Sequence, residues 1–270
     1  MNDRHTSRFA QTGIYIRRCF RLFKNEKGWK NFVTTGLITL LICMVTGEDF
    51  LVEAGPTEKG AFALMSACIW SGIFNSIRSV CRERSIFKRE HRTGLHISSY
   101  VAAHWIYEAI ICLGEAVIVT VIIYIANRTH FTDEGIFLPA ILEYFISFFL
   151  ILLSADALGL LISSVVRNEN TAMTVMPFAL IIQLIMSGMI FELEGLTDKI
   201  SLITISRWGQ AAICITARYN DTLSLFQAEK ELYEMTAGNL MKMWFFLIFF
   251  AVLYGVIATI ALEFVDRDQR

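Results

Sequence analysis

The sequence is short of residues that break helices and of motifs that carry catalysis. Only three of its 270 residues are prolines, and proline inside a helix breaks or kinks it. No G-x-x-x-x-G-K-[ST] loop occurs, so the chain lacks the backbone amides and lysine that hold nucleotide phosphates. The five histidines show no H-E-x-x-H spacing, and no G-x-S-x-G motif occurs. The sequence therefore predicts neither a catalytic site nor a metal site.

Paired cysteines and large patches of one charge are absent too. The six cysteines are scattered singly, without a C-x-x-C pair. The formal net charge is -1, and there is no acidic tail or basic nucleic-acid patch, so nucleic acid is not expected as a partner. Cys214 alone falls in a segment expected outside the cytoplasm. It could bridge to its copy across a dimer there, or it could be a buried free thiol.

Apolar residues dominate what is present. They make up 55% of the chain, and the mean hydropathy is +0.52, whereas a soluble domain averages about 45–50% apolar residues. Six stretches approach the roughly 20 apolar residues that span about 30 Å of hydrocarbon. These stretches are Asn31–Gly47, Gly60–Cys81, Ile97–Ala126, Leu138–Val166, Thr171–Phe191 and Leu240–Phe264. The sequence thus predicts an all-α polytopic membrane protein with six transmembrane helices.

The basic residues predict the orientation of these spans. Most of the 24 lysines and arginines lie before the first span, in residues 78–92, and at the C-terminus. The first loop on the other side, residues 48–59, is mostly acidic. Because cytoplasmic loops collect basic residues, we expect a multi-pass protein of the cell membrane with both termini in the cytoplasm.

Two segments outside the spans have patterns of their own. In residues 1–30, apolar and basic side chains recur on different faces of a helix. The apolar set is Phe9, Ile16, Phe20 and Phe23, and the basic set is Arg17, Arg21 and Lys24. This predicts an amphipathic helix at the membrane surface, with a partly disordered basic leader as the alternative. Residues 192–239 contain apolar runs too short to cross, which favours re-entrant or interfacial helices forming an outer cap.

The charged segment between the second and third spans carries a family resemblance. Residues 83–90 read ERSIFKRE, which resembles the E-R-x-x-F-x-R-E signature of permease domains in the G subfamily of ATP-binding-cassette exporters and their bacterial relatives, the type-2 exporters. The resemblance continues through GLHISSY at residues 94–100 and IIYIANR at residues 122–128. It also covers residues 187–221, which look like the end of the fifth span and the outer re-entrant region of that family.

The resemblance implies a domain organisation and partners. A six-span permease domain would occupy residues 31–270, preceded by a connecting helix in residues 1–30. Two such units would form a dimer, either of identical copies or with a sister permease, in contact with membrane lipid. Since this sequence has no phosphate loop, ATP and Mg²⁺ would bind to a separate ATP-binding subunit or to a part of the protein that this sequence does not include, and no cofactor is expected in this chain.

In this family the short helix after the second span, here residues 82–92, is a coupling helix that docks against the ATP-binding subunit. The residues expected to make this contact are Glu83, Arg84, Phe87, Arg89 and Glu90. Phe87 would fill a pocket as an anchor while its charged neighbours make charge-assisted hydrogen bonds. By the family pattern Glu90 would also contact the N-terminal helix, where the candidates are Arg17, Arg18 and Arg21. The alternative is a basic segment that only fixes topology.

The resemblance also implies a transport pathway between the second and fifth spans. The residues expected to line it are Cys68, Ser71 and Phe74 together with Ile181, Leu184 and Ile185. Met189 and Ile190 would form an apolar outer gate. Ordinary packing is the alternative for each of these residues. Gln183 is expected to face the pathway or another helix rather than lipid. The largely apolar lining favours amphipathic, lipid-like or peptide cargo moved by alternating access.

Ionisable residues inside the spans support a rival function. His104 and Glu108 stand four residues apart and are expected to pair. Glu115, Glu143 and Asp156 also lie in or near spans, where a carboxylate needs a partner or water. Structural pairing is one reading of these groups. The other is a proton-coupled secondary carrier that works without an ATPase.

Overall fold

The computed structural model describes residues 7–47, 50–92, 94–131, 133–191, 193–223 and 230–267. Nearly all of these residues lie in helices, which confirms the predicted all-α class. The longer helices are α2 (Trp29–Thr46), α3 (Ala54–Ser76), α5 (Ile97–Ala126), α6 (Ala140–Val165) and α10 (Ala237–Arg267). The shorter ones are α1 (Arg8–Asn25), α4 (Ser79–Arg92), α7 (Glu169–Ile185), α8 (Leu196–Ser201), α9 (Ile205–Thr216), η2 (Tyr219–Thr222) and η3 (Glu231–Tyr233).

Five of the predicted spans correspond to helices long and apolar enough to cross a membrane, within the described part of the chain. The predicted fifth span is represented by the shorter apolar helix α7. This helix ends at Ile185 because the backbone turns directly after it. Ser187 Oγ donates to the carbonyl of Leu184 at 2.8 Å, and Gly188 has a φ of 79°, a conformation that glycine adopts without strain.

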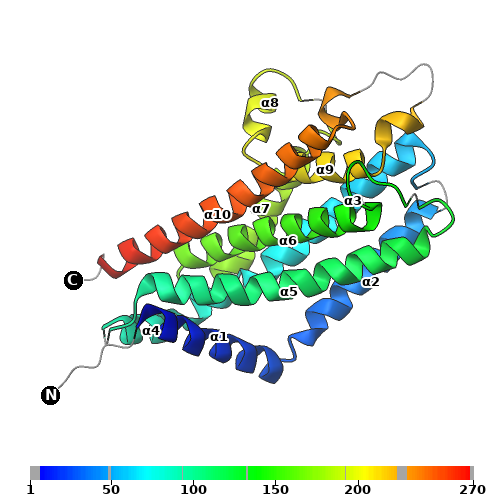
Figure 1. Ribbon diagram of the computed structural model, residues 1–270. Helices are drawn as coiled ribbons and strands as arrows, with labels where there is room; N and C mark the ends of the chain where they lie inside the picture. The colour runs from blue at the N-terminus through cyan, green and yellow to red at the C-terminus, as the bar shows by residue number, and fades with distance from the viewer. Residues whose placement is uncertain are drawn as a thin grey trace.

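Helix α6 lies at the centre of the bundle (Figure 1). It packs against α3, α5 and α10, while α2 packs against α3 and α5. Helix α1 lies along α5 near α4 and the end of α10, and α8 and α9 lie away from that end. The short segments that the sequence places before the first span and after the fifth are therefore separate helices at different ends of the bundle.

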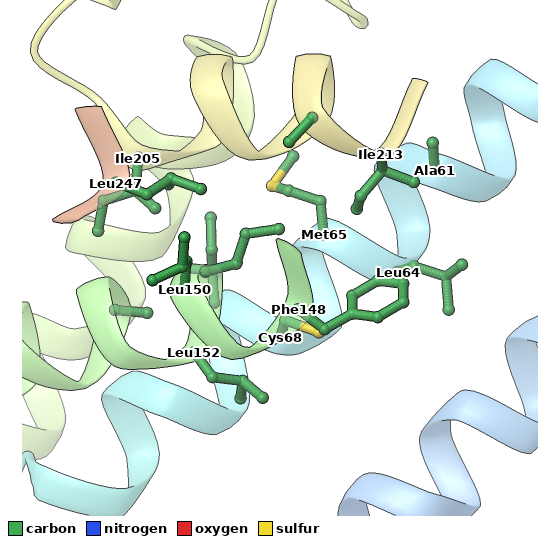
Figure 2. Packing of buried hydrophobic residues seen from close by; sticks show 14 of the residues in the cluster. Ala61, Leu64, Met65, Cys68, Phe148, Leu150, Leu152, Ile205, Ile213 and Leu247 are labelled. Carbon is green, nitrogen blue, oxygen red and sulfur yellow. The ribbon is translucent and has the colours of Figure 1, made fainter. Parts of the chain in front are cut away.

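The α3–α6 contact depends on two glycines. A Cβ atom on Gly72 would come within 2.5 Å of the carbonyl oxygen of Leu152, and one on Gly159 within 2.7 Å of the carbonyl oxygen of Ile73. Small residues of this kind let two helix backbones approach closely. Around the crossing, Met65 of α3, Phe148 of α6 and side chains from α9 and α10 form one buried apolar cluster (Figure 2).

Helix α9 is almost wholly buried against α3, α6 and α10. Cys214 on this helix is fully buried and its thiol is free. Of the two alternatives for this residue, a disulfide to a second copy or a buried free thiol, the structure shows the buried thiol. Residues after α9 are tied to Glu58 of α3. The Glu58 carboxylate pairs with Lys230 and accepts hydrogen bonds of 3.3 Å from the hydroxyls of Tyr219 and Tyr233.

Candidate functional site: the α1–α4 junction and the α2–α3 pocket

Helix α4 has one buried face and one exposed face. Val80 and Phe87 are buried, whereas Arg82, Ser85 and Arg89 are exposed. The exposed positions follow helical spacing, so they share a side of the helix. This side is the surface that α4 offers to anything outside the chain.

Phe87 fills a pocket of this chain and not one of a partner. Its side chain is 2% exposed. Its ring centroid lies 4.9 Å from that of Tyr100 and 6.1 Å from that of His91, and Leu262 of α10 belongs to the same apolar cluster. The expectation that Phe87 anchors a separate subunit is therefore corrected, because its apolar ring is already buried between α5, α6 and α10. Any part that it takes in coupling stays a prediction.

Arg18 of α1 bridges two acidic residues of α4. Its guanidinium lies 3.1 Å from Glu83 Oε1 and 3.3 Å from Glu90 Oε2. The contact that the resemblance implied between Glu90 and the N-terminal helix is thus present, and it runs through Arg18. Tyr15 adds a contact that the sequence reasoning missed, since its hydroxyl donates to Glu90 Oε2 at 2.5 Å. Tyr15 lies one helical turn before Arg18 and so on the same face of α1, and this spacing could have revealed its contact with Glu90.

Burial raises the pKa of the Tyr15 hydroxyl well above its usual range, and the hydrogen bond to Glu90 raises this pKa further. The hydroxyl therefore stays protonated and remains a donor at any physiological pH. Because the Arg18 and Glu83 side chains are mostly shielded, with 28% and 13% exposed, this junction is less open to screening than a surface ion pair.

Arg82 joins α4 to two further elements. It donates to Glu26 Oε2 at 2.6 Å, just beyond the end of α1, and its Nε lies 3.9 Å from Glu169 Oε1 in the first turn of α7. The hydrogen bond from Arg82 lowers the pKa of the Glu26 carboxyl, against a smaller opposing effect of burial. The three charged groups therefore connect α1, α4 and α7 at one end of the bundle.

Helix α4 is also fixed to the central helix. Ser163 Oγ of α6 accepts hydrogen bonds of 3.1 Å from the backbone amides of Val80 and Cys81. Arg84 donates to the carbonyl oxygen of Val166, directly after α6. The side chain of the predicted coupling residue Arg84 is therefore hydrogen-bonded within this chain, whereas the side chain of Arg89 is exposed. A displacement of α4 would be passed to α1 and α6 through these bonds.

The predicted pathway residues of the second span line a pocket. Cys68, Ser71 and Phe74 of α3 face residues of α2 across a pocket of about 160 Å³. The residues predicted on the fifth span, Ile181, Leu184 and Ile185, do not line this pocket. The two predicted groups therefore do not meet in this pocket. Their role in a pathway stays a prediction.

The predicted gate residues follow the end of α7. Met189 is half-buried and Ile190 is 46% exposed, and the Met189 amide donates to Ser187 Oγ at 3.3 Å. Both residues thus lie in the turn after α7 and not inside the helix. Their role as a gate stays a prediction.

A buried carboxylate of α5 lies behind the pocket between α2 and α3. Glu115 Oε1 accepts hydrogen bonds from Thr35 at 3.1 Å and from Ser71 at 3.0 Å, and Glu115 Oε2 accepts one from Asn75 at 2.9 Å. Asn31 in turn donates to Asn75 Oδ1 at 2.8 Å. Glu115 is fully buried, so these donors supply the partners that a carboxylate away from water requires.

The other intramembrane polar groups have different surroundings. Glu143 accepts hydrogen bonds of 2.8–3.0 Å from the amides of residues 136–138. His104 does not make the predicted pair with Glu108 in the described chain, since its Nδ1 lies 3.9 Å from Cys19 Sγ of α1 instead. The docking of α1 on α5 explains this difference. Asp156 departs from the expectation of a partner, because neither of its carboxyl oxygens has a hydrogen bond among the described residues.

Gln183 faces another helix, as predicted. It is buried, and its Oε1 accepts a hydrogen bond of 3.1 Å from the backbone amide of Ser206 in α9. The amide group at this position therefore joins α7 to the start of α9.

Comparison with known proteins gives two matches. A family model described as ABC-2 type transporter matches residues 10–216, the region from α1 to the end of α9. The chain is also similar to the ABC transporter ATP-binding/permease protein Rv1747 of Mycobacterium tuberculosis, with 26% identity over 223 residues. That alignment covers 78% of this chain and 26% of the relative, so the chain spans about a quarter of the relative's length.

Proposed function

Because the chain belongs to the ABC-2 type transporter membrane family, we propose that it is the permease subunit of an ATP-driven exporter. In this proposal a separate ATP-binding subunit holds ATP and Mg²⁺ and docks on the exposed side of α4. Two permease units, identical or related, enclose the pathway. The relative's name joins ATP-binding and permease functions, which supports a permease that works with an ATP-binding part.

The observation that carries the proposal is the attachment of α4. One side of this helix is bonded to α1 through Arg18 and to α6 through Ser163. The other side presents Ser85 and Arg89 outward, beside Arg82, whose guanidinium is held by Glu26 and Glu169. A subunit that binds the exposed side and moves would displace α1 and α6 together with α4, and this is the transmission that alternating access requires.

The cargo class is part of the proposal. The pocket beside Cys68, Ser71 and Phe74 is mainly apolar, which favours amphipathic, lipid-like or peptide molecules. The rival proton-coupled carrier needs carboxylates that are free to exchange protons with water. Glu115 and Glu143 are engaged by fixed donors, and Glu108 and Asp156 are almost wholly buried away from water, which favours the exporter.

Reversing the charge at Arg89 tests the docking surface. We expect Arg89→Glu to weaken binding of the ATP-binding subunit about tenfold or more, because like or mismatched charges across an interface are costly. The measurement is the amount of ATP-binding subunit that co-purifies with the variant, together with the ATP hydrolysis of the reconstituted complex.

Lys199→Glu is the matched control. Lys199 is an exposed residue of α8, away from α4, and its reversal should leave both readouts unchanged. Circular dichroism and the size-exclusion profile report whether each variant is folded. If folded Arg89→Glu retains the subunit and the hydrolysis rate of the parent chain, the exposed side of α4 is not the docking surface.

A further inference from the structure

A second pocket lies at the bend between α1 and α2. It has a volume of about 320 Å³ and lies between α1, the α3–α4 region and α5; we call it the elbow pocket. The bend is formed by Lys27, whose φ is 58°, and by Gly28. A Cβ atom on Gly28 would lie 2.1 Å from the ring of Phe23. Only glycine fits at that position, so the bend has a defined geometry.

The elbow pocket has an excess of cations that are not paired with carboxylates. Lys27, Lys30 and Arg78 line it. All three are exposed and none forms a salt bridge in the described part of the chain, although Arg78 helps to lower the pKa of Glu26. Arg78 packs over the ring of Phe74 with its Cζ 5.4 Å from the centroid. Three cations around one pocket create a site for an anion.

Three acidic residues also line the elbow pocket, but two of them are already paired. Glu26 is bonded to Arg82, and Glu83 to Arg18. Glu108 is 3% exposed. The acidic groups therefore do not offset the positive charge that faces solvent.

The elbow pocket adjoins the pocket between α2 and α3. Asn31, Phe74 and Asn75 line both. In the α2–α3 pocket the polar groups Thr35 and Ser71 are bonded to Glu115, so the remaining lining is mainly apolar. A charged compartment therefore leads directly into an apolar one, beside the junction of a predicted surface helix and the first span.

We propose that these two pockets together hold one anionic phospholipid of the cytoplasmic leaflet. Its phosphate headgroup lies beside Lys27, Lys30 and Arg78, and the first part of an acyl chain enters the α2–α3 pocket. Basic pockets between helices on the cytoplasmic side are the places where acidic headgroups bind. The proposal depends on the predicted orientation of α1 at the membrane surface and not on the exporter function, although the acyl chain would occupy the same α2–α3 pocket that the proposed cargo would use.

Native mass spectrometry of the full chain tests the lipid site. The chain is given equal amounts of phosphatidylglycerol and phosphatidylcholine with the same acyl chains, and the ratio of retained lipids is measured. We expect the parent chain to retain phosphatidylglycerol preferentially. We expect Lys30→Gln to lower that ratio about fivefold, the effect of one cation near an anionic headgroup.

Lys24→Gln is the matched control, because Lys24 is an exposed lysine near the end of α1 that does not line the pocket. It should leave the ratio unchanged. A second variant, Ala67→Phe, fills the apolar compartment that Ala67 lines and should lower retention of phosphatidylglycerol while all three cations remain.

Three results overturn the proposal. The first is equal retention of both lipids by the parent chain. The second is an equal loss of preference in Lys24→Gln and Lys30→Gln, which means general surface attraction. The third is displacement of the lipid by an excess of soluble glycerol phosphate, which means a free-anion site in which the acyl chain plays no part.

Discussion

At the scale of single residues, the α1–α4 junction combines charges that depend on pH in different ways. Tyr15 and Arg18 stay protonated over the physiological range, and both contact Glu90. Glu26 differs, because the hydrogen bond from Arg82 lowers its pKa from an ordinary value of 4.5. Its contribution to the folded state is therefore fully present above about pH 4.5 and is lost as the pH falls through the lower pKa of the folded chain.

This behaviour gives a prediction for acid conditions. We expect the Arg82-linked end of α1 to loosen below about pH 4.5 in the parent chain, while Glu26→Gln removes that step. Hydrogen exchange of the last turn of α1, followed from pH 6 to pH 3 with correction for intrinsic rates, measures it. Glu231→Gln changes an exposed glutamate far from Arg82 and should preserve the step. The same acid profile in Glu26→Gln and in the parent contradicts the assignment.

At the scale of helices, the closest contact is the crossing of α3 and α6. We expect Gly72→Ala to destabilise the protein by about 1–3 kcal/mol, because the new methyl group would meet the backbone of Leu152 at 2.5 Å. Gly55→Ala is the control on the same helix, since a Cβ at Gly55 meets nothing within 4 Å. Thermal unfolding in detergent compares the two. Equal melting temperatures for both variants would mean that the α3 and α6 backbones move apart to fit the methyl group with no loss of stability.

At the scale of the whole molecule, α3 carries attachments at both ends. Glu58 near its start holds Lys230, Tyr219 and Tyr233, and α4 follows its end. We expect Glu58→Gln to speed hydrogen exchange of residues 217–223 and 230–236 about tenfold, the effect of weakening hydrogen bonds to a charged group. Glu231→Gln is the nearby control. Equal exchange in both variants means that the Glu58 contacts do not restrain this segment.

The sequence predicted the helices better than their contacts. Hydropathy located the spans because lipid requires long apolar helices, and charge located α1 and α4. The direction of Phe87 was missed, since an eight-residue signature does not say which side of α4 meets α5. The sequence also could not say how the predicted pathway residues of α3 and α7 are placed relative to each other. Spacing along α3 and α7 fixes which residues share a face, but it does not fix where the two helices stand relative to each other.

The tight α3–α6 crossing limits which parts of the bundle can rearrange. The backbones of α3 and α6 approach so closely at Gly72 and Gly159 that sliding one helix along the other would bring larger residues against the facing backbone. We therefore expect these two helices to move as one rigid pair. Helix α2 buries little of its surface within the chain, and it borders both pockets. Of the five helices long enough to cross a membrane, α2 would lose the fewest packing contacts on shifting, and an outward movement of α2 would open both pockets.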